Sequence, residues 1–347
     1  MPDFSTCRRG WGRAGEPGQW THAGPVALAD VLWWLDSVAE PRPAPPPAIV
    51  DGHSLVTAYP NFGPPWDDHA ADNVAPLVND LAHLANTDGR RGHPARGTDW
   101  TALWEGAREY LRRRGLAGEY EVRGGAGWRP AEVEAALADG AGAVLLLGVW
   151  EPHADGGPRR VGGHYAALAG ADLEPGDTAL VALSDPLADA AQTSGGRSVP
   201  DDPEIHSCRE APLAHDDPGV VSQDVYALAD TGLPGSPPEL EGYFAPQSYG
   251  EAAAFAGMNS AAFVAAFNGQ WTGGAVVMTI DALMFVSPVP APPTATPTGE
   301  TPGPPGTPSA SPPPTATATS TPAEATPTAA IRQEGGRVML PFAVAGP

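Results

Sequence analysis

The chain has no lysine: all nineteen of its basic residues are arginine, and 41 acidic residues bring the formal net charge to -22. A surface with this excess of negative charge repels nucleic acid and anionic membranes, so neither is expected as a partner. Uninterrupted apolar runs of about 18 residues are also missing, and the sequence therefore predicts no membrane-spanning helix.

Cysteine is nearly as scarce, with Cys7 and Cys208 alone in 347 residues. They allow one disulfide, and the sequence does not decide whether it forms. The first residues lack the apolar core of a signal peptide. Either the chain is cytoplasmic or its start lies downstream of a removed or missed signal, and the composition of the C-terminal region favours the second alternative.

That C-terminal region is dominated by proline, threonine, alanine and serine. Residues 288–330 offer almost nothing to bury and are predicted to form a disordered stalk. Residues 331–347 form a short hydrophobic tag that is too short to cross a bilayer. The arrangement resembles bacterial surface proteins with a Thr-Pro spacer and a terminal Leu-Pro-hydrophobic tag. It implies an extracellular or cell-surface protein that is attached through this tail.

Residues 20–37, WTHAGPVALADVLWWLDS, are the stretch around which the domain is expected to form. Their apolar residues fall on nearly every side of a helical wheel, whereas a surface helix would keep one polar face. Pro25 suits the first helical position, because its missing N–H has no intrahelical partner there. The stretch predicts a central helix that is covered by other elements.

The rest of residues 1–287 predicts helices first and strands afterwards, an α+β order. Thr98 is a candidate cap for a helix that ends at Gly115, and Pro130 opens another helix. The predicted helices cover residues 74–85, 100–114, 130–138 and 252–267, and the predicted strands cover residues 143–150, 163–171, 178–184, 225–229 and 275–286.

His164 lies on one of these strands, and Asp185 directly follows the next. If the two strands form a hairpin that closes symmetrically, Ala171 faces Thr178 and His164 faces Asp185. Cross-strand partners have Cβ atoms about 5 Å apart, within reach of an imidazole–carboxylate hydrogen bond. An imidazole that is oriented by a carboxylate is what a general base in nucleophilic catalysis requires.

Three motifs, W-T-H-A-G-P-V-A with L-W-W-L-D-S, then G-H-Y, then S-D-P, resemble papain-like cysteine peptidases of the C39-like, secreted bacterial type. The resemblance implies a central N-terminal helix on a mainly antiparallel sheet over residues 1–287. It also implies a nucleophile at the position of Ala23, His164 as general base and Asp185 as its orienting group. Gln19, four positions before Ala23, is the nearest candidate for the oxyanion hole.

Ala23 stands where the family has its cysteine, and an alanine has no atom that can attack a carbonyl. The sequence therefore predicts a catalytically silent member, a pseudoenzyme that binds a peptide or protein in the residual cleft. Two alternatives stay open: an active hydrolase with an unrecognised nucleophile, for which Thr21, His22 and the two cysteines are the candidates, and a non-catalytic surface or adhesion module. No cofactor or metal is expected, since residues 51–72 are interpreted as a solvated acidic loop rather than a calcium site.

Overall fold

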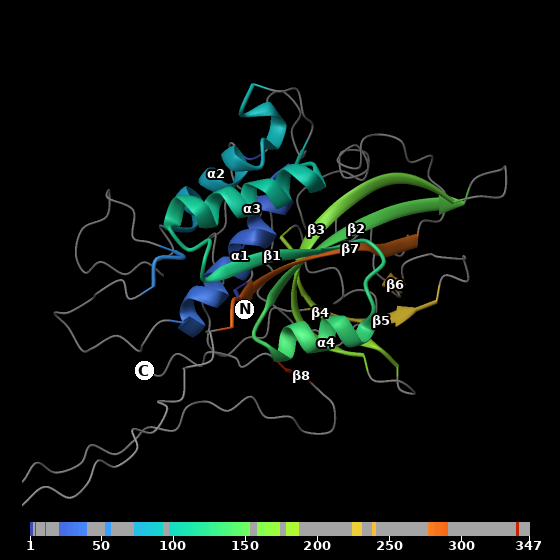
Figure 1. The fold of residues 1–347 in the computed structure, drawn as a ribbon. Coiled ribbons are helices and arrows are strands. Elements are labelled where there is room, and N and C mark those ends of the chain that lie inside the picture. The colour runs from blue at the N-terminus through green and yellow to red at the C-terminus, as the bar shows by residue number, and fades with distance from the viewer. Residues whose placement is uncertain are drawn as a thin grey trace, which may run out of the picture.

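The computed structural model describes residues 1–2, 4, 11, 21–39, 53–56, 73–92, 97–152, 158–173, 178–186, 224–230, 238–240, 277–290 and 338–339. Within these ranges four α-helices lie against one antiparallel sheet (Figure 1). The helices are α1 (Ala23–Ala39), α2 (Val74–Leu84), α3 (Trp100–Arg114) and α4 (Pro130–Ala138).

The strands of the sheet follow the order β1-β7-β2-β3-β4-β5-β6, and β6 also pairs with β7, so that the strands from β2 to β7 close into a ring. A further strand, β8, pairs with β3. The bounds are β1 (Tyr120–Gly125), β2 (Gly142–Pro152), β3 (Pro158–Asp172), β4 (Leu180–Ser184), β5 (Asp224–Ala229), β6 (Glu239–Leu240), β7 (Val277–Pro288) and β8 (Val338–Met339). The expected α+β class with an antiparallel sheet is confirmed.

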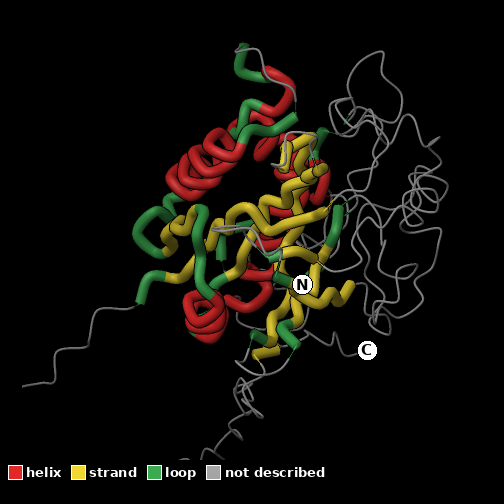
Figure 2. The backbone as a smooth tube through the Cα atoms, turned by 90° about the vertical axis from the view of Figure 1, so that its right-hand side faces the viewer, coloured by secondary structure: helices red, strands yellow, loops and turns green. Residues whose placement is uncertain are grey.

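Two hydrophobic cores lie on the two sides of this sheet, as the period of two along a strand requires. The inner core takes side chains from each strand of the ring and from α4: Leu137, Leu145, Leu168, Leu183, Tyr226, Leu240 and Ile280. The outer core joins the sheet to α1, α2 and α3. Figures 1 and 2 show α2 and α3 together on one side of the strands and α4 on the other.

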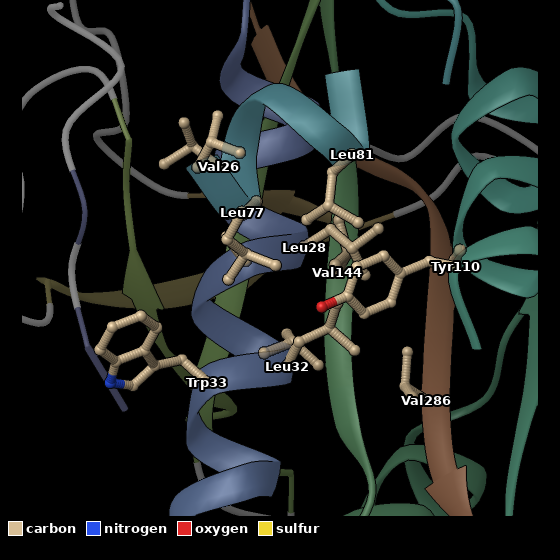
Figure 3. Packing of buried hydrophobic residues seen from close by; sticks show 14 of the residues in the cluster. Val26, Leu28, Leu32, Trp33, Leu77, Leu81, Tyr110, Val144 and Val286 are labelled. Atoms are coloured by element: carbon tan, nitrogen blue, oxygen red, sulfur yellow. The ribbon is translucent and has the colours of Figure 1, made fainter. Parts of the chain in front are cut away.

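Helix α1 is buried along almost its whole length, from Gly24 to Asp36. In Figure 3, Leu28 and Leu32 point toward Val144 of β2 and Tyr110 of α3. At the start of β2, a Cβ on Gly142 would lie 2.6 Å from Val31, so the helix packs directly on the backbone of the sheet. The prediction of a covered central helix is therefore confirmed.

The helix begins at Ala23, two residues before Pro25. The His22 carbonyl accepts the first helical bond, from the Val26 N–H at 2.9 Å. Pro25 is therefore the third helical residue. The helix loses no hydrogen bond there, because N–H groups of the first turn have no intrahelical partner. The prediction that Pro25 opens the helix was two residues late.

Other expectations also need correction. Asp99, not Thr98, caps α3, and its carboxylate accepts hydrogen bonds from the N–H groups of Thr101 and Ala102 at 2.9 and 3.2 Å.

Strands β1, β6 and β8 were not predicted, and β8 lies in the C-terminal tag. The predicted helix at 252–267, residues 291–330 of the predicted stalk and most of the tag lie outside the described residues. Among the described helices, none is long and apolar enough to cross a membrane.

The close approach of α2 and α3 gives a testable prediction. A Cβ on Gly106 would lie 2.9 Å from the backbone nitrogen of Ala85, where nothing flexible can yield. Gly106→Ala should therefore lower the free energy of unfolding by about 1–3 kcal/mol, although alanine is favoured over glycine in a helix by about 1 kcal/mol. Urea unfolding measures this change. The control is Gly118→Ala, where a Cβ meets nothing within 4 Å; its free energy of unfolding should stay within about 0.5 kcal/mol of the wild type. A Gly106→Ala variant that is more stable than the wild type would contradict the close packing of Gly106 on Ala85.

Candidate functional site

The sequence-predicted pair His164 and Asp185 is in contact. The imidazole Nε2 lies 2.7 Å from the carboxylate Oδ1, and both residues are buried, with 6% of each exposed. A buried imidazole beside a buried carboxylate is held in one orientation. Because Nε2 faces Asp185, Nδ1 is the nitrogen that is left to face a reacting group.

The contact does not arise from the predicted register. Ala171 faces Val181 rather than Thr178, and a bulge lies between Leu168 and Gly170. Ala167 faces Ser184, and one more step in the same register sets Asp185 opposite Ala166, two positions from His164. The pair is therefore a diagonal one on the same strand face, a geometry that long and aromatic side chains can still bridge.

The two sides of β3 have different neighbours near this pair. His164 faces Leu147, an inner-core residue, across the β2–β3 pairing. Tyr165, the next residue, belongs to the outer core with α1 and α3. The described contacts thus join Tyr165, rather than His164, to the helices, and the placement of His164 opposite Ala23 stays a prediction.

Ala23 itself lies half-buried at the N-terminus of α1. The next residue, Gly24, is packed so tightly that a Cβ there would lie 3.3 Å from Thr98 and from Leu103. The Tyr165 hydroxyl donates to the Thr98 carbonyl at 2.9 Å. Ala23 thus directly precedes a tightly packed residue, but its own side chain carries no reactive atom.

A polar network fixes the residues that precede the helix. His22 is 1% exposed and stacks on Trp11, with ring centroids 5.6 Å apart. Its Nδ1 lies 3.2 Å from the Thr21 hydroxyl, and its Nε2 lies 2.8 Å from the guanidinium of Arg90. The Thr21 hydroxyl also contacts a carboxylate oxygen of Asp88.

The donors in this network can be assigned. A guanidinium only donates, so Nε2 of His22 must accept, and the proton of the neutral ring lies on Nδ1. That proton points at the Thr21 oxygen, whose own proton is directed to the Asp88 carboxylate or to the Trp11 carbonyl, 3.0 Å away. His22 in this tautomer cannot take a proton from Thr21. Among the described residues, Thr21 therefore has no histidine base, and its hydrogen bonds hold the helix start in place.

Asp88 and Arg90 were not predicted from the sequence. They lie on a loop that contains the 3-10 turn Thr87–Gly89, in which Asn86 and Asp88 adopt left-handed backbone angles with φ of 51° and 53°. The Asp88 carboxylate also accepts the Gly97 N–H at 2.8 Å, which closes the loop. Asn and Asp tolerate this conformation better than most residues, and that preference was the available signal.

Several candidates lie outside the described residues. These are Gln19, Cys7, Cys208 and most of the acidic stretch 51–72. His53, which is described, has its Nε2 2.8 Å from the Tyr120 hydroxyl. In the part of the chain that the structure describes, no group of three His, Cys, Asp or Glu side chains is placed to hold a metal ion.

Comparison of the chain with protein-family models, with curated proteins and with solved structures gave no match. The contacts and the sequence motifs therefore carry the functional argument.

The His22 network predicts a pH dependence. Burial, and then the charge of Arg90, lower the pKa of His22 from 6.5 to about 4, against the opposing effect of Asp88. The unfolded chain binds this proton more readily, so the stability that depends on neutral His22 is present above pH 6.5 and is lost as the pH falls toward 4. Between pH 7 and pH 5 the free energy of unfolding of the wild type should fall by about 2 kcal/mol more than that of His22→Gln. Urea unfolding measures both free energies. An equal fall in the two proteins would contradict the assignment of His22 as a buried, neutral histidine.

Proposed function

We propose that this chain is an exported, C39-like cysteine-peptidase domain that has lost its nucleophile and binds a peptide or protein segment without cutting it. The single observation that carries the proposal is the start of α1 at a half-buried alanine. A helix N-terminus with unpaired N–H groups is where an active homologue would hold its thiolate. Here the same point offers N–H donors to a ligand and no attacking atom.

Two further observations support this function. His164 and Asp185, which the resemblance implies as base and orienting group, are hydrogen bonded. The Nε2 bond to Asp185 leaves Nδ1 as the ring nitrogen that a nucleophile would use, as general-base chemistry requires. The α+β architecture with a buried central helix is also the one that the resemblance implies.

The alternative of an active hydrolase is less well supported. Thr21 lies two residues before the start of α1, and the proton arrangement around it supplies no histidine base among the described residues. The location of the protein at the cell surface, through the Pro/Thr-rich tail, remains part of the proposal. The Pro, Thr, Ala and Ser content of residues 288–330 supports it.

The proposal predicts that a cysteine at position 23 is activated. In a Cys7→Ser/Cys208→Ser background, the Ala23→Cys thiol should react with iodoacetamide at neutral pH about tenfold faster than an ordinary thiol, because the helix N-terminus favours the thiolate. The matched control is Ser37→Cys, at the exposed C-terminal end of the same helix. Adding His164→Ala should slow the Ala23→Cys reaction severalfold.

Equal rates at positions 23 and 37 would overturn the proposed site. A fast Ala23→Cys that is indifferent to His164→Ala would show that the imidazole faces elsewhere.

The unmodified protein should bind members of a random peptide library and release them intact, as mass spectrometry of the recovered peptides can verify. Cleavage that persists after removal of both cysteines would establish a different nucleophile. A library that yields no bound peptide would refute the binding function.

A further inference from the structure

A pair of glycines marks an unusual place on the sheet. Gly148 of β2 and Gly163 of β3 face each other, on the same side of the strands as Tyr165. A Cβ on Gly148 would lie 2.2 Å from the Asp281 carboxylate, and a Cβ on Gly163 would lie 2.5 Å from the Arg160 guanidinium. The two missing side chains thus make room for an ion pair that lies flat on the backbone.

Asp281 is the fixed member of this ion pair. Its Oδ1 accepts from the Trp150 indole N–H at 3.1 Å and from the Thr279 hydroxyl at 2.7 Å, and its Oδ2 accepts from Nε of Arg160 at 2.8 Å. Only 14% of its side chain is exposed. With both oxygens engaged, this carboxylate serves to hold Arg160 in one orientation.

Arg160 is the solvent-exposed residue of the ion pair, with 39% of its side chain exposed. Its Nε bonds Asp281 and one NH2 proton reaches the Leu147 carbonyl at 3.5 Å. Of its five N–H groups, the others have no partner among the described residues. A guanidinium that is held through Nε offers its outer edge for a second, bidentate bond to a carboxylate.

The position of Arg160 connects it to the start of α1. The Arg160 guanidinium lies against Gly163, which is two residues before Tyr165 on the same side of β3. Tyr165 in turn bonds Thr98, which packs on Gly24 beside Ala23. A ligand that extends from the start of α1 along this side of β3 therefore comes to Arg160.

We propose that Arg160 binds a carboxylate of the peptide that the domain holds, and so selects acidic peptides or peptide C-termini. This inference rests on the proposed peptide-binding function. A single carboxylate fits better than a polyanion such as nucleic acid, because the net charge of -22 repels extended negative charge. The planar donor edge also matches a carboxylate in shape.

The test uses a peptide selected from the library by the full-length protein and prepared in three forms. One carries its acidic side chains and a free C-terminus, one has Glu and Asp replaced by Gln and Asn, and one has an amidated C-terminus. Fluorescence anisotropy measures the affinity of each form. The form that lacks the recognised carboxylate should bind about 10- to 100-fold more weakly, as loss of a charge-assisted hydrogen bond implies.

The matching protein variants are Arg160→Gln and Arg160→Lys. Arg160→Gln should weaken binding of the carboxylate form to the level of the neutral form. The affinity of Arg160→Lys should lie between those of the wild type and Arg160→Gln, since lysine keeps the charge but lacks the two parallel N–H donors of a guanidinium. The control is Arg113→Gln, which removes an equal charge from α3, where Arg113 pairs with Glu109. It should leave all affinities unchanged.

Equal binding of all three peptide forms by the wild type would overturn the role of Arg160 and leave the peptide-binding function intact. This comparison holds even if Arg160→Gln fails to fold. If no peptide binds in any form, the proposed function fails and this inference fails with it.

Discussion

A helix without a polar face can persist in water only if other elements cover it on every side, and α1 imposes that requirement on the whole domain. The two aspartates inside it show how the requirement is met. Asp30 accepts the backbone N–H of Phe4, and Asp36 accepts those of Leu55 and Val56, each at 3.0 Å. Charges that would be costly to bury therefore bind the surrounding chain to the helix.

The same constraint explains why the candidate site is rigid. Since α1 cannot shift within its covering, its first residue stays at one point relative to the sheet. Three sets of contacts hold the start of the helix. His22 stacks on Trp11 and bonds Arg90, Thr21 bonds Asp88, and Gly24 packs against Thr98. On the sheet side, Tyr165 and Arg160 lie on the same face of β3, with Gly163 between them, and Asp281 of β7 pairs with Arg160. The proposed binding surface would therefore need little reorganisation when a ligand arrives.

The sequence predicted the elements with strong local signals. The buried helix, the Gly115 stop and the apolar strand β2 follow from periodicity and from backbone preferences that neighbouring residues share. The partnership of His164 with Asp185 was also predicted, although by the wrong register, because nothing in the sequence marks the bulge near Gly170. The Asp281 cluster could not be predicted, since its partners Trp150 and Arg160 are more than a hundred positions away and meet it only through sheet pairing.

Strand β8 changes what the Pro/Thr-rich segment can do. The segment leaves the sheet after β7 and returns to it at β8, so both of its ends are tied to the same body. Closing a loop of roughly fifty residues costs about 3 kcal/mol of chain entropy. Two paired residues of β8 provide little to oppose that cost. Tension on the C-terminus would therefore detach β8 from β3 before it disturbed the ring of strands.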